Sequence, residues 1–375
     1  MKLCLVIESG TDVRLVEGLA SRCALTVLAR PIPSGATISR PTDAAALRLG
    51  PGGRAAFAAF ATRALVAAGA RFDRVLVQGY GLAALAAAAA RAITRVPHVM
   101  LVCSPAEHYY QCRRVNGDDA QPYSAAAHAG IVAAAGLNAQ VGAPYVVLSR
   151  YLASVVREHG ARGRVAVVPV YGVDTDRFAP PTESRAALRE RLGLPAGGHL
   201  VFHSSRVAPE KDTPTVLAAL ARLLAEGRDV RLLHRSGGWR DVAALAQRAG
   251  VADRVIATDA AHPQKDLAWS YQASDLVVQA SLDEGLGFSV LEALACHTPV
   301  VATAVGGLRE TIVAGRTGWT VPPRDADALA RAMADALDHP AEARARAEAG
   351  RALVLSGYRE TDVFDRLLAE LDAAA

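Results

Sequence analysis

Residues 276–307 read LVVQASLDEGLGFSVLEALACHTPVVATAVGG. The apolar runs LVVQAS and PVVATA are typical of buried strands, and the segment FSVLEALAC between them is typical of a helix. A strand, a helix and a second strand in this order predict a βαβ unit, in which both strands are parallel in one sheet. A glycine-flanked turn, EGLG, precedes the helix.

The same alternation of short apolar runs and helical stretches continues through the chain. Six predicted strands precede residue 171, and six follow residue 198: 2–9, 24–29, 74–79, 98–104, 145–149 and 164–170, then 199–205, 230–236, 254–259, 276–281, 299–304 and 318–322. Two sets of six predict an α/β protein with two Rossmann-like, doubly wound parallel-sheet domains.

Proline and glycine mark the boundary between the two predicted domains. GVDTDRFAPP and GLPAGG flank a charged helical stretch between Tyr171 and Gly198. We expect a first domain over residues 1–176 and a second over residues 177–357. Residues 358–375 form an amphipathic pattern, and we expect this last helix to pack back on the first domain.

The composition is that of a globular protein. The 375 residues are 51% hydrophobic and 21% charged, with a net charge of +4, which excludes a disordered or fibrous chain. The most apolar run, 75–93, is interrupted by Gln78 and Arg91, and the N-terminus lacks a signal-peptide pattern. We therefore expect a cytoplasmic protein with no membrane span. Five scattered cysteines without a CxxC pair suggest neither a disulfide framework nor a zinc site.

Charge is divided unevenly along the chain. Residues 1–170 carry 18 Lys+Arg and 9 Asp+Glu, a net charge of +9, whereas the remainder carries −5. Solvated arginines are one interpretation, and attraction to a phosphorylated acceptor or a lipid surface is the other. Only three residues are lysines, against 38 arginines, so a retained lysine is a candidate for specific chemistry.

One candidate site lies around the turn at residues 284–288. Glu284 precedes Gly285-Leu286-Gly287, and Phe288 begins the helix that carries Glu292. Unpaired N–H groups at a helix N-terminus hold phosphate or another oxygen-rich group. Two carboxylates eight positions apart can grip two parts of one ligand, and a carboxylate accepts hydrogen bonds from a vicinal diol such as ribose.

A second candidate site follows the first strand of the second domain. In HSSRVAPEKDTPTVLAAL, residues 203–220, Arg206 and Lys211 lie in a loop before a helix. The loop leaves the carboxyl end of a strand, where open α/β sheets bind their ligands. Two cations without an acidic metal cluster suit a diphosphate that side chains neutralise in place of Mg²⁺.

The segment 103–123 is the candidate acceptor site. It gathers polar and aromatic side chains at a strand end, a combination that stacks against rings and bonds hydroxyl groups: Glu107, His108, Tyr109, Tyr110, Arg113 and Arg114. We hypothesise that His108 or Glu107 assists the acceptor nucleophile.

These motifs resemble those of the retaining family 4 glycosyltransferases (glycosyl transferases group 1) of GT-B fold. EGLGFSVLE (284–292) is similar to their E-x7-E motif, SRVAPEK (205–211) to their diphosphate loop, VPVYGVDTDRF (168–178) to their hinge entry, and AVGGLRETIVAGRTGW (304–319) to the segment after the E-x7-E helix. The resemblance covers nearly all of residues 165–335.

The resemblance implies a nucleotide-sugar donor in the second domain, with no cofactor and no tightly bound metal. Arg206 and Lys211 would hold the diphosphate, Glu292 the ribose and Glu284 the sugar hydroxyls. The remaining implied donor contacts come from Ser205, from the backbone of Gly285, Leu286, Gly287 and Phe288, and from Gly10. The catalytic candidates are Arg206, Lys211, Glu284 and His108.

Two features depart from the family pattern. The first loop, SGTDVRLVEGLA, offers only Gly10 where the family has a Gly-Gly pair. Cys103 stands where the family often carries a histidine, and Cys103, Glu107 and His108 are the candidates for the polar group there. CSPAEHYYQCRR is also similar to glycosyltransferases of actinobacterial antibiotic assembly, which act on aminocyclitols or other small polar acceptors.

The predicted function is retaining transfer of a hexose-like sugar from a UDP- or GDP-sugar to a small polar acceptor, by a monomer or homodimer. A phosphorylated or lipid-linked acceptor is the first alternative. The GxGxxA pattern at Gly79, Gly81 and Ala84 leaves an NAD(P)-dependent oxidoreductase as another. A phosphorylase, an epimerase and a non-catalytic nucleotide-sugar sensor are also open. The DxD-like pairs Asp174/Asp176 and Asp325/Asp327 are interpreted as a hinge turn and a helix cap, and no pattern indicates nucleic-acid binding.

Overall fold

The computed structural model describes residues 1–9, 13–31, 45–116, 124–235, 238–258 and 264–373. The contacts between these residues divide the chain into two compact units. Unit 1 contains Met1–Glu107, Ser124–Gly172 and Glu360–Ala375, and unit 2 contains His108–Tyr123 and Val173–Arg359. The predicted boundary at 176/177 lies four residues after the break at Gly172, but the sequence did not predict that residues 108–123 join unit 2.

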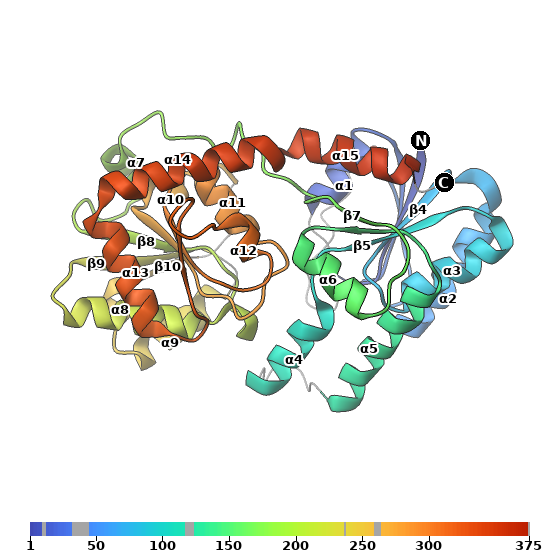
Figure 1. The fold of residues 1–375 in the computed structure, drawn as a ribbon, viewed down its shortest axis with the longest axis horizontal. Coiled ribbons are helices and arrows are strands. Elements are labelled where there is room, and N and C mark those ends of the chain that lie inside the picture. The colour runs from blue at the N-terminus through green and yellow to red at the C-terminus, as the bar shows by residue number, and fades with distance from the viewer. Residues whose placement is uncertain (10–12, 32–44, 117–123, 236–237, 259–263, 374–375) are drawn as a thin grey trace. The chain divides into compact units, whose positions relative to one another are not determined.

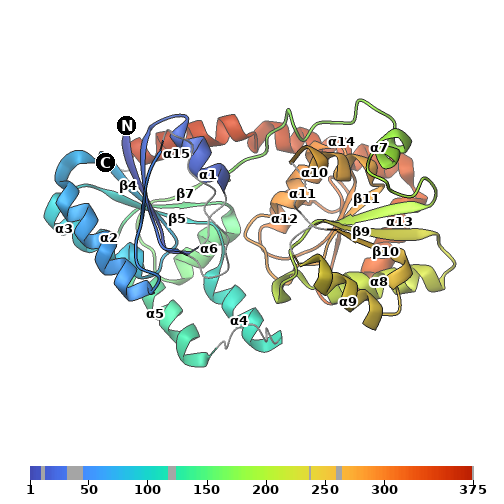
Figure 2. The same ribbon diagram turned by 180° about the vertical axis from the view of Figure 1, so that it is seen from behind.

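Unit 1 is built on a seven-stranded parallel sheet with the order β3-β2-β1-β4-β5-β6-β7. Figures 1 and 2 show this sheet from opposite sides, with β4, β5 and β7 labelled. The strands are β1 (Lys2–Ile7), β2 (Ala24–Ala29), β3 (Ala45–Leu49), β4 (Arg74–Gln78), β5 (His98–Val102), β6 (Tyr145–Val147) and β7 (Val165–Val167). The central strands are rich in Val and Leu and almost wholly buried, as expected for parallel strands covered on both faces.

The number of strands predicted for this domain is wrong, because β3 adds a seventh to the predicted six. Its sequence, AALRL, contains no β-branched residue, and among the residues that the structure describes β3 pairs only with β2, at one edge of the sheet. An exposed edge strand does not need a continuous apolar run, so its sequence carries no strand signal.

The helices of unit 1 include the last one in the chain. They are α1 (Val13–Ala20), α2 (Arg54–Ala68), α3 (Leu82–Thr94), α5 (Ala125–Gln140), α6 (Arg150–Glu158) and α15 (Glu360–Ala373), and α4 (Ala106–Asn116) starts in unit 1 and continues in unit 2. Phe364 of α15 is fully buried against Gly18 of α1, and the Leu371 carbonyl accepts a hydrogen bond from Arg74 at 2.9 Å. Residues from both ends of the chain thus share one core.

Unit 2 contains a six-stranded parallel sheet with the order β10-β9-β8-β11-β12-β13. The strands are β8 (His199–His203), β9 (Val230–Arg235), β10 (Val255–Thr258), β11 (Leu276–Gln279), β12 (Val300–Thr303) and β13 (Trp319–Val321). This is the 3-2-1-4-5-6 strand order of a dinucleotide-binding fold. From β8 the chain adds β9 and β10 on one side and then β11, β12 and β13 on the other, so the order reverses between β8 and β11. Ligands of such sheets bind at the carboxyl ends of the two strands at this switch point.

Helices cover both faces of the unit 2 sheet, with α8, α9 and α13 on one side and α10, α11 and α14 on the other (Figure 1). The helices are α7 (Arg185–Arg191), α8 (Thr213–Ala225), α9 (Trp239–Arg248), α10 (Gln264–Ala273), α11 (Phe288–Ala295), α12 (Leu308–Thr311), α13 (Ala326–Asp338) and α14 (Pro340–Gly357). Asp325 caps α13 by accepting the Ala328 N–H at 2.8 Å, which is the capping role predicted for this acidic pair.

Candidate active site

The candidate site of unit 2 lies at the carboxyl ends of β8 and β11. β8 ends at His203 and leads into a loop that carries Arg206 and Lys211 before α8 begins. β11 ends at Gln279 and leads into the loop that carries Glu284 before α11 begins. The two predicted motifs therefore start from adjacent strands at the switch point of the sheet.

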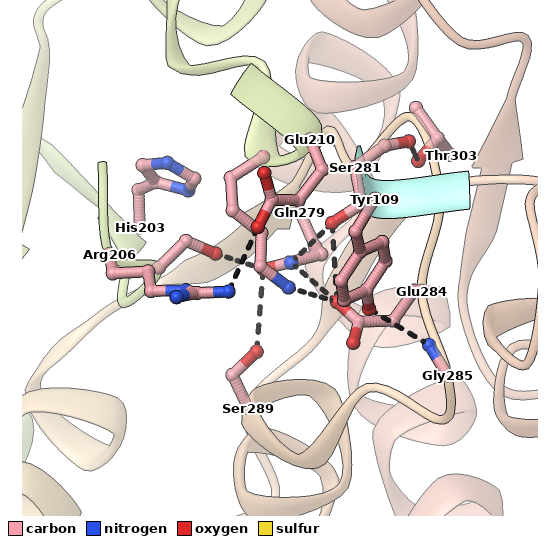
Figure 3. A network of polar contacts seen from close by, with 12 residues as sticks. Tyr109, His203, Arg206, Glu210, Gln279, Ser281, Glu284, Gly285, Ser289 and Thr303 are labelled. Atoms are coloured by element: carbon pink, nitrogen blue, oxygen red, sulfur yellow. Dashed lines mark hydrogen bonds and ion pairs between the residues drawn. The ribbon is translucent and has the colours of Figure 1, made fainter. Parts of the chain in front are cut away.

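Lys211 and Glu284 are in direct contact. The Lys211 Nζ atom donates to Glu284 Oε2 at 2.5 Å, and both side chains are largely buried, with 12% and 13% of their surface exposed. The same oxygen lies 3.4 Å from Gln279 Nε2 and 3.3 Å from Ser281 Oγ (Figure 3). Lys211, the predicted diphosphate ligand, and Glu284, the predicted sugar ligand, thus form one ion pair.

Gln279 links this pair to the other loop. Its Oε1 atom accepts from Ser205 Oγ at 2.8 Å and from Ser289 Oγ at 3.3 Å, and its Nε2 atom donates to Ser281 Oγ at 2.7 Å. Gln279 is 1% exposed. A buried amide with these partners holds the two loops in one arrangement, because leaving any of its polar groups unpaired costs free energy.

Arg206 is held by a buried carboxylate, Glu210. The Arg206 Nη2 atom donates to Glu210 Oε1 at 2.8 Å (Figure 3). Arg113 of α4 donates to both oxygens of Glu210, at 2.6 Å and 3.0 Å. Burial alone raises the pKa of a carboxyl group, but the hydrogen bonds and charge of Arg113, together with Arg206, lower the pKa of Glu210, so the group is ionised.

Glu292 has a different set of partners. Its Oε2 atom accepts from the Tyr271 hydroxyl at 3.0 Å, and that hydroxyl also lies 2.8 Å from Ser204 Oγ. Burial, with the adjacent Glu292 carboxylate, raises the pKa of Tyr271 well above its usual range, so the hydroxyl keeps its proton and donates. Ser204 lies next to Ser205 in the β8 loop, which links Glu292 to the rest of the site.

The turn before α11 depends on glycine. Gly287 has a φ of +93°, a conformation that glycine adopts without steric cost, and Leu286 is buried. Phe288 begins the helix, and the Gly285 N–H donates to the Tyr109 hydroxyl at 3.3 Å (Figure 3). Within unit 2, the predicted donor-binding turn therefore already has a polar partner from α4.

Two further glycines support this turn. A Cβ atom on Gly307 would lie 2.3 Å from the Gly285 carbonyl oxygen, and the Gly307 N–H donates to the Glu284 carbonyl at 2.9 Å. A Cβ atom on Gly306 would come equally close to Glu284. Side chains at these positions do not fit the observed packing, so the glycine pair fixes the backbone of the Glu284 loop.

The acceptor candidates on α4 lie near the same loop. His108 Nδ1 is 3.0 Å from Asp283 Oδ2, beside Glu284 in the sequence. Burial, and then the charges of Glu284 and Asp283, raise the pKa of Tyr109 well above its usual range. Tyr110 is half-buried on the same helix.

Glu107 is placed elsewhere, in unit 1. Its carboxylate accepts from the Tyr80 hydroxyl and lies 3.0 Å from His159 Nε2. Burial opposes its ionisation, but the hydrogen bonds from His159 and Tyr80 lower the pKa of Glu107. The Tyr171 hydroxyl donates to the Cys103 sulfur at 3.1 Å. Glu107 is thus engaged within unit 1, and Gly10 lies outside the described residues.

A carboxylate occupies the glycine-rich turn that suggested dinucleotide binding. Glu8, at the end of β1, is 7% exposed, and its Oε2 atom accepts the Ala83 N–H at the start of α3 at 2.9 Å. A Cβ atom on Gly81 would lie 2.6 Å from the same oxygen. A dinucleotide pyrophosphate needs this helix N-terminus for itself, and a fixed negative charge there opposes its binding.

Sequence reasoning missed several residues that hold the site together: Glu210, Tyr271, Gln279, Ser281, Gly306 and Gly307. Glu210 lies between two residues that were selected, and Gln279 is a polar residue at the end of an apolar strand. Both signals were present, but the buried partners that give these residues a role come from distant parts of the chain.

Similarity to solved structures identifies the class of fold. Sucrose-phosphate synthase from Thermosynechococcus elongatus matches with a TM-score of 0.80 and 22% identity, over 99% of this chain and 100% of that one. Anabaena HepE in complex with UDP matches with a TM-score of 0.80 and 19% identity, over all of both chains. With its two parallel-sheet α/β units, the protein has the GT-B fold of glycosyltransferases.

Residues 184–353 match the model of the family described as glycosyl transferases group 1. The D-inositol 3-phosphate glycosyltransferase of Xylanimonas cellulosilytica is 42% identical over 196 residues, 48% of this chain and 46% of that protein. The GDP-mannose-dependent alpha-(1-6)-phosphatidylinositol monomannoside mannosyltransferase of Mycolicibacterium smegmatis is 38% identical over 197 residues, 50% of this chain and 51% of that protein. The matched part therefore spans about half the length of these curated relatives.

Within the described ranges, none of the helices has the length and apolar character needed to cross a membrane.

Proposed function

We propose that this chain transfers a glycosyl group from a UDP- or GDP-sugar to a hydroxyl group of a small polar acceptor, with retention of anomeric configuration. The observation that carries the proposal is the contact between Lys211 and Glu284, 2.5 Å apart at the switch point of the unit 2 sheet. A cation and a carboxylate placed together there suit a ligand that has a diphosphate at one end and sugar hydroxyls at the other.

The reaction breaks the bond between the anomeric carbon and the diphosphate oxygen, and the electron pair leaves with the diphosphate. A new bond forms between the anomeric carbon and the acceptor oxygen, and the acceptor hydroxyl gives its proton to a basic side chain or to the leaving diphosphate. Negative charge grows on the leaving diphosphate during this step. Arg206 and Lys211 would stabilise that charge, most strongly in the transition state. His108 remains the candidate group for assisting the acceptor hydroxyl.

The site supplies its own positive charge, and we propose that no metal or cofactor is required. Arg206 and Lys211 come from one loop and reach two separate carboxylates, Glu210 and Glu284. Activity that is unchanged by a chelator, and not increased by added Mg²⁺, would agree with neutralisation by side chains. A requirement for Mg²⁺ would contradict it.

The relatives favour a phosphorylated form of the small polar acceptor. Those described above are named for D-inositol 3-phosphate and for a phosphatidylinositol mannoside, which are a phosphorylated cyclitol and a lipid-linked one. The excess of 18 basic over 9 acidic residues in the first 170 residues is compatible with such an anion. Cyclitol phosphates are therefore the first acceptors to test, followed by unphosphorylated cyclitols and lipid-linked cyclitols.

Binding of UDP, GDP, ADP and dTDP, measured by thermal shift, tests the donor site. A nucleotide at 100 times its Kd stabilises the protein by about 2.7 kcal/mol, which is readily measured. Lys211→Met is the test variant, because it keeps the apolar stem of the side chain and removes the charge. We expect stabilisation by UDP or GDP in the wild type and a much smaller shift in the variant. No shift with any nucleotide would contradict the proposal.

Product analysis tests the reaction. With UDP-sugars and GDP-sugars as donors, NMR of the product reports its anomeric configuration. Inversion would refute the retaining mechanism, and release of free sugar without acceptor transfer would refute the acceptor assignment. Binding without turnover in the presence of the acceptor panel would instead indicate a nucleotide-sugar sensor.

A further inference from the structure

Glu210 binds two arginines, and the two bonds differ in kind. Arg113 donates through two nitrogens to two oxygens, at 2.6 Å and 3.0 Å, and 23% of its side chain is exposed. Arg206 donates through one nitrogen to Oε1 at 2.8 Å, and 57% of its side chain is exposed. The two arginines therefore share one oxygen of a carboxylate that is 0% exposed.

Burial of the carboxylate makes the Arg113 bond the permanent one. A buried charge without a partner is strongly unfavourable, and a bidentate arginine satisfies both oxygens in a fixed geometry. If Arg206 moves away, Arg113 still bonds both oxygens of Glu210. If Arg113 is lost, Glu210 keeps only the single bond from the exposed Arg206. Arg206 is thus the exchangeable partner.

The backbone of Glu210 also connects the two loops of the site. The N–H group of Leu282, which lies two residues before Glu284, donates to the Glu210 carbonyl at 2.8 Å. Lys211 follows Glu210 directly and contacts Glu284. A displacement of Glu210 therefore changes the positions of Arg206, Lys211 and the Glu284 loop together.

We propose that Arg113 and Glu210 are positioning residues for donor binding: the buried ion pair holds Arg206 next to the site until a donor diphosphate takes the Arg206 guanidinium from Glu210. This inference rests on the proposed function. It assigns Arg113 to the donor diphosphate through Glu210, in place of the acceptor contact that the sequence predicted.

The two roles of Arg113 have different kinetic signatures. An acceptor contact raises the acceptor KM when it is removed and leaves nucleoside diphosphate binding unchanged. A positioning role raises the donor KM, weakens nucleoside diphosphate binding and leaves the acceptor KM near the wild-type value. The effect of a positioning residue also depends on Arg206, because it acts through that side chain.

The test compares Arg113→Ala, Arg113→Lys, Glu210→Gln and Arg206→Ala in the full chain. Arg254→Ala is the control, since Arg254 lies outside the candidate sites and donates to Asp229 at 2.8 Å at the surface of the same unit. Calorimetry with UDP and GDP gives the Kd, steady-state kinetics give both KM values, and the Tm monitors folding. We expect Arg113→Ala and Glu210→Gln to weaken nucleotide binding about tenfold or more. Arg113→Lys should recover part of it, and Arg254→Ala should match the wild type.

The double variant Arg113→Ala/Arg206→Ala separates positioning from a general structural defect. If Arg113 acts through Arg206, its loss weakens binding much less in the Arg206→Ala background than in the wild type. Full additivity overturns the inference, as does an Arg113→Ala effect confined to the acceptor KM. A wild-type protein that binds neither nucleotide refutes the proposed function itself, and the inference with it. Normal wild-type binding with an unaffected Arg113→Ala variant refutes the inference alone.

Discussion

Gly306 lies against the carbonyl group of Glu284 so closely that a Cβ atom on it would be 2.2 Å from the Glu284 oxygen. Gly306 also has a φ of +46°, a region that most residues avoid. The backbone of the loop carrying the sugar-binding candidate is thus set by a residue 22 positions later in the sequence, beyond α11 and β12.

Gly306→Ala should therefore impair catalysis. The methyl group must push the Glu284 loop away, and a displacement of about 1 Å at a reacting centre can cost roughly 100-fold in rate. Steady-state kinetics should show this loss in kcat/KM. Gly197→Ala is the control, because a Cβ atom there meets nothing within 4 Å. Equal activity of the two variants would show that the loop tolerates the shift.

Arg206→Ala should remove about 2–4 kcal/mol of transition-state stabilisation, by analogy with the loss of one donor to a developing negative charge. The value of kcat/KM should fall accordingly. The measurement is initial rate against donor concentration at saturating acceptor. Arg254→Ala, which removes an arginine paired with Asp229 at the surface of the same unit, is the control. Near-normal kcat/KM in Arg206→Ala would remove this residue from the diphosphate site.

Tyr271→Phe should weaken nucleoside diphosphate binding about fivefold to tenfold. The change removes the hydroxyl that donates to Glu292 at 3.0 Å and bonds Ser204 at 2.8 Å, and one hydrogen bond contributes about 1 kcal/mol. The ring and its packing against Phe178 and Phe202 remain. Calorimetry gives the Kd, and an unchanged value would mean that Glu292 does not depend on this bond for its position.

Gly18→Ala should destabilise unit 1. A Cβ atom on this helical glycine would lie 2.1 Å from the Phe364 ring, and such overpacking costs about 1–3 kcal/mol. Gly130→Ala in α5 is the control, because a Cβ atom there is in open space and the substitution should stabilise the helix by roughly 0.5–1 kcal/mol. Urea unfolding should shift in opposite directions for the two variants. A shift in the same direction would contradict the close packing of α1 and α15.

The free energy of unfolding should fall as the pH decreases below about 6.5. Burial, with a charged or imidazole neighbour, lowers the pKa of His203 to about 3 and that of His98 to about 4, and burial lowers that of His234 to about 4. Between these values and about 6.5 the unfolded state binds more protons, so stability increases with pH.

Each buried histidine should contribute a loss of roughly 1 kcal/mol between pH 6.5 and 5.5. Urea unfolding at pH 7.0, 6.0 and 5.5 measures the slope, and His98→Leu should reduce it. A free energy of unfolding that is constant over this range would mean that these imidazoles gain protons as readily when folded as when unfolded.

Much of the architecture could be predicted because parallel strands buried on both faces leave continuous apolar runs. All twelve predicted runs contain strands of the two sheets, and their division into two sets predicted two parallel-sheet domains. The GT-B fold was expected from the resemblance of the motifs. β3 was missed because an exposed edge strand carries no such run. The residues 108–123 were expected in the first domain, because local sequence does not show that Arg113 bonds Glu210, 97 positions later.

For the candidate site, short motifs were sufficient to select Arg206, Lys211 and Glu284, since each motif lies within one loop. The partners of Glu284 and Glu292 were not selected, because Gln279 and Tyr271 belong to elements whose approach depends on the strand order. Arg113 was selected as one of several polar and aromatic residues at a strand end, and its bidentate bond to Glu210 became visible only in the folded chain.

The packing of α15 into unit 1 has a consequence for biosynthesis. Phe364, Leu367 and Leu371 are fully buried there, yet the ribosome makes them after the whole of unit 2. Domains usually fold in the order in which they are synthesised, N-terminal first. Here the nascent first unit must wait with part of its interior open to water until translation reaches α15, so the unit that is synthesised earlier completes its core later.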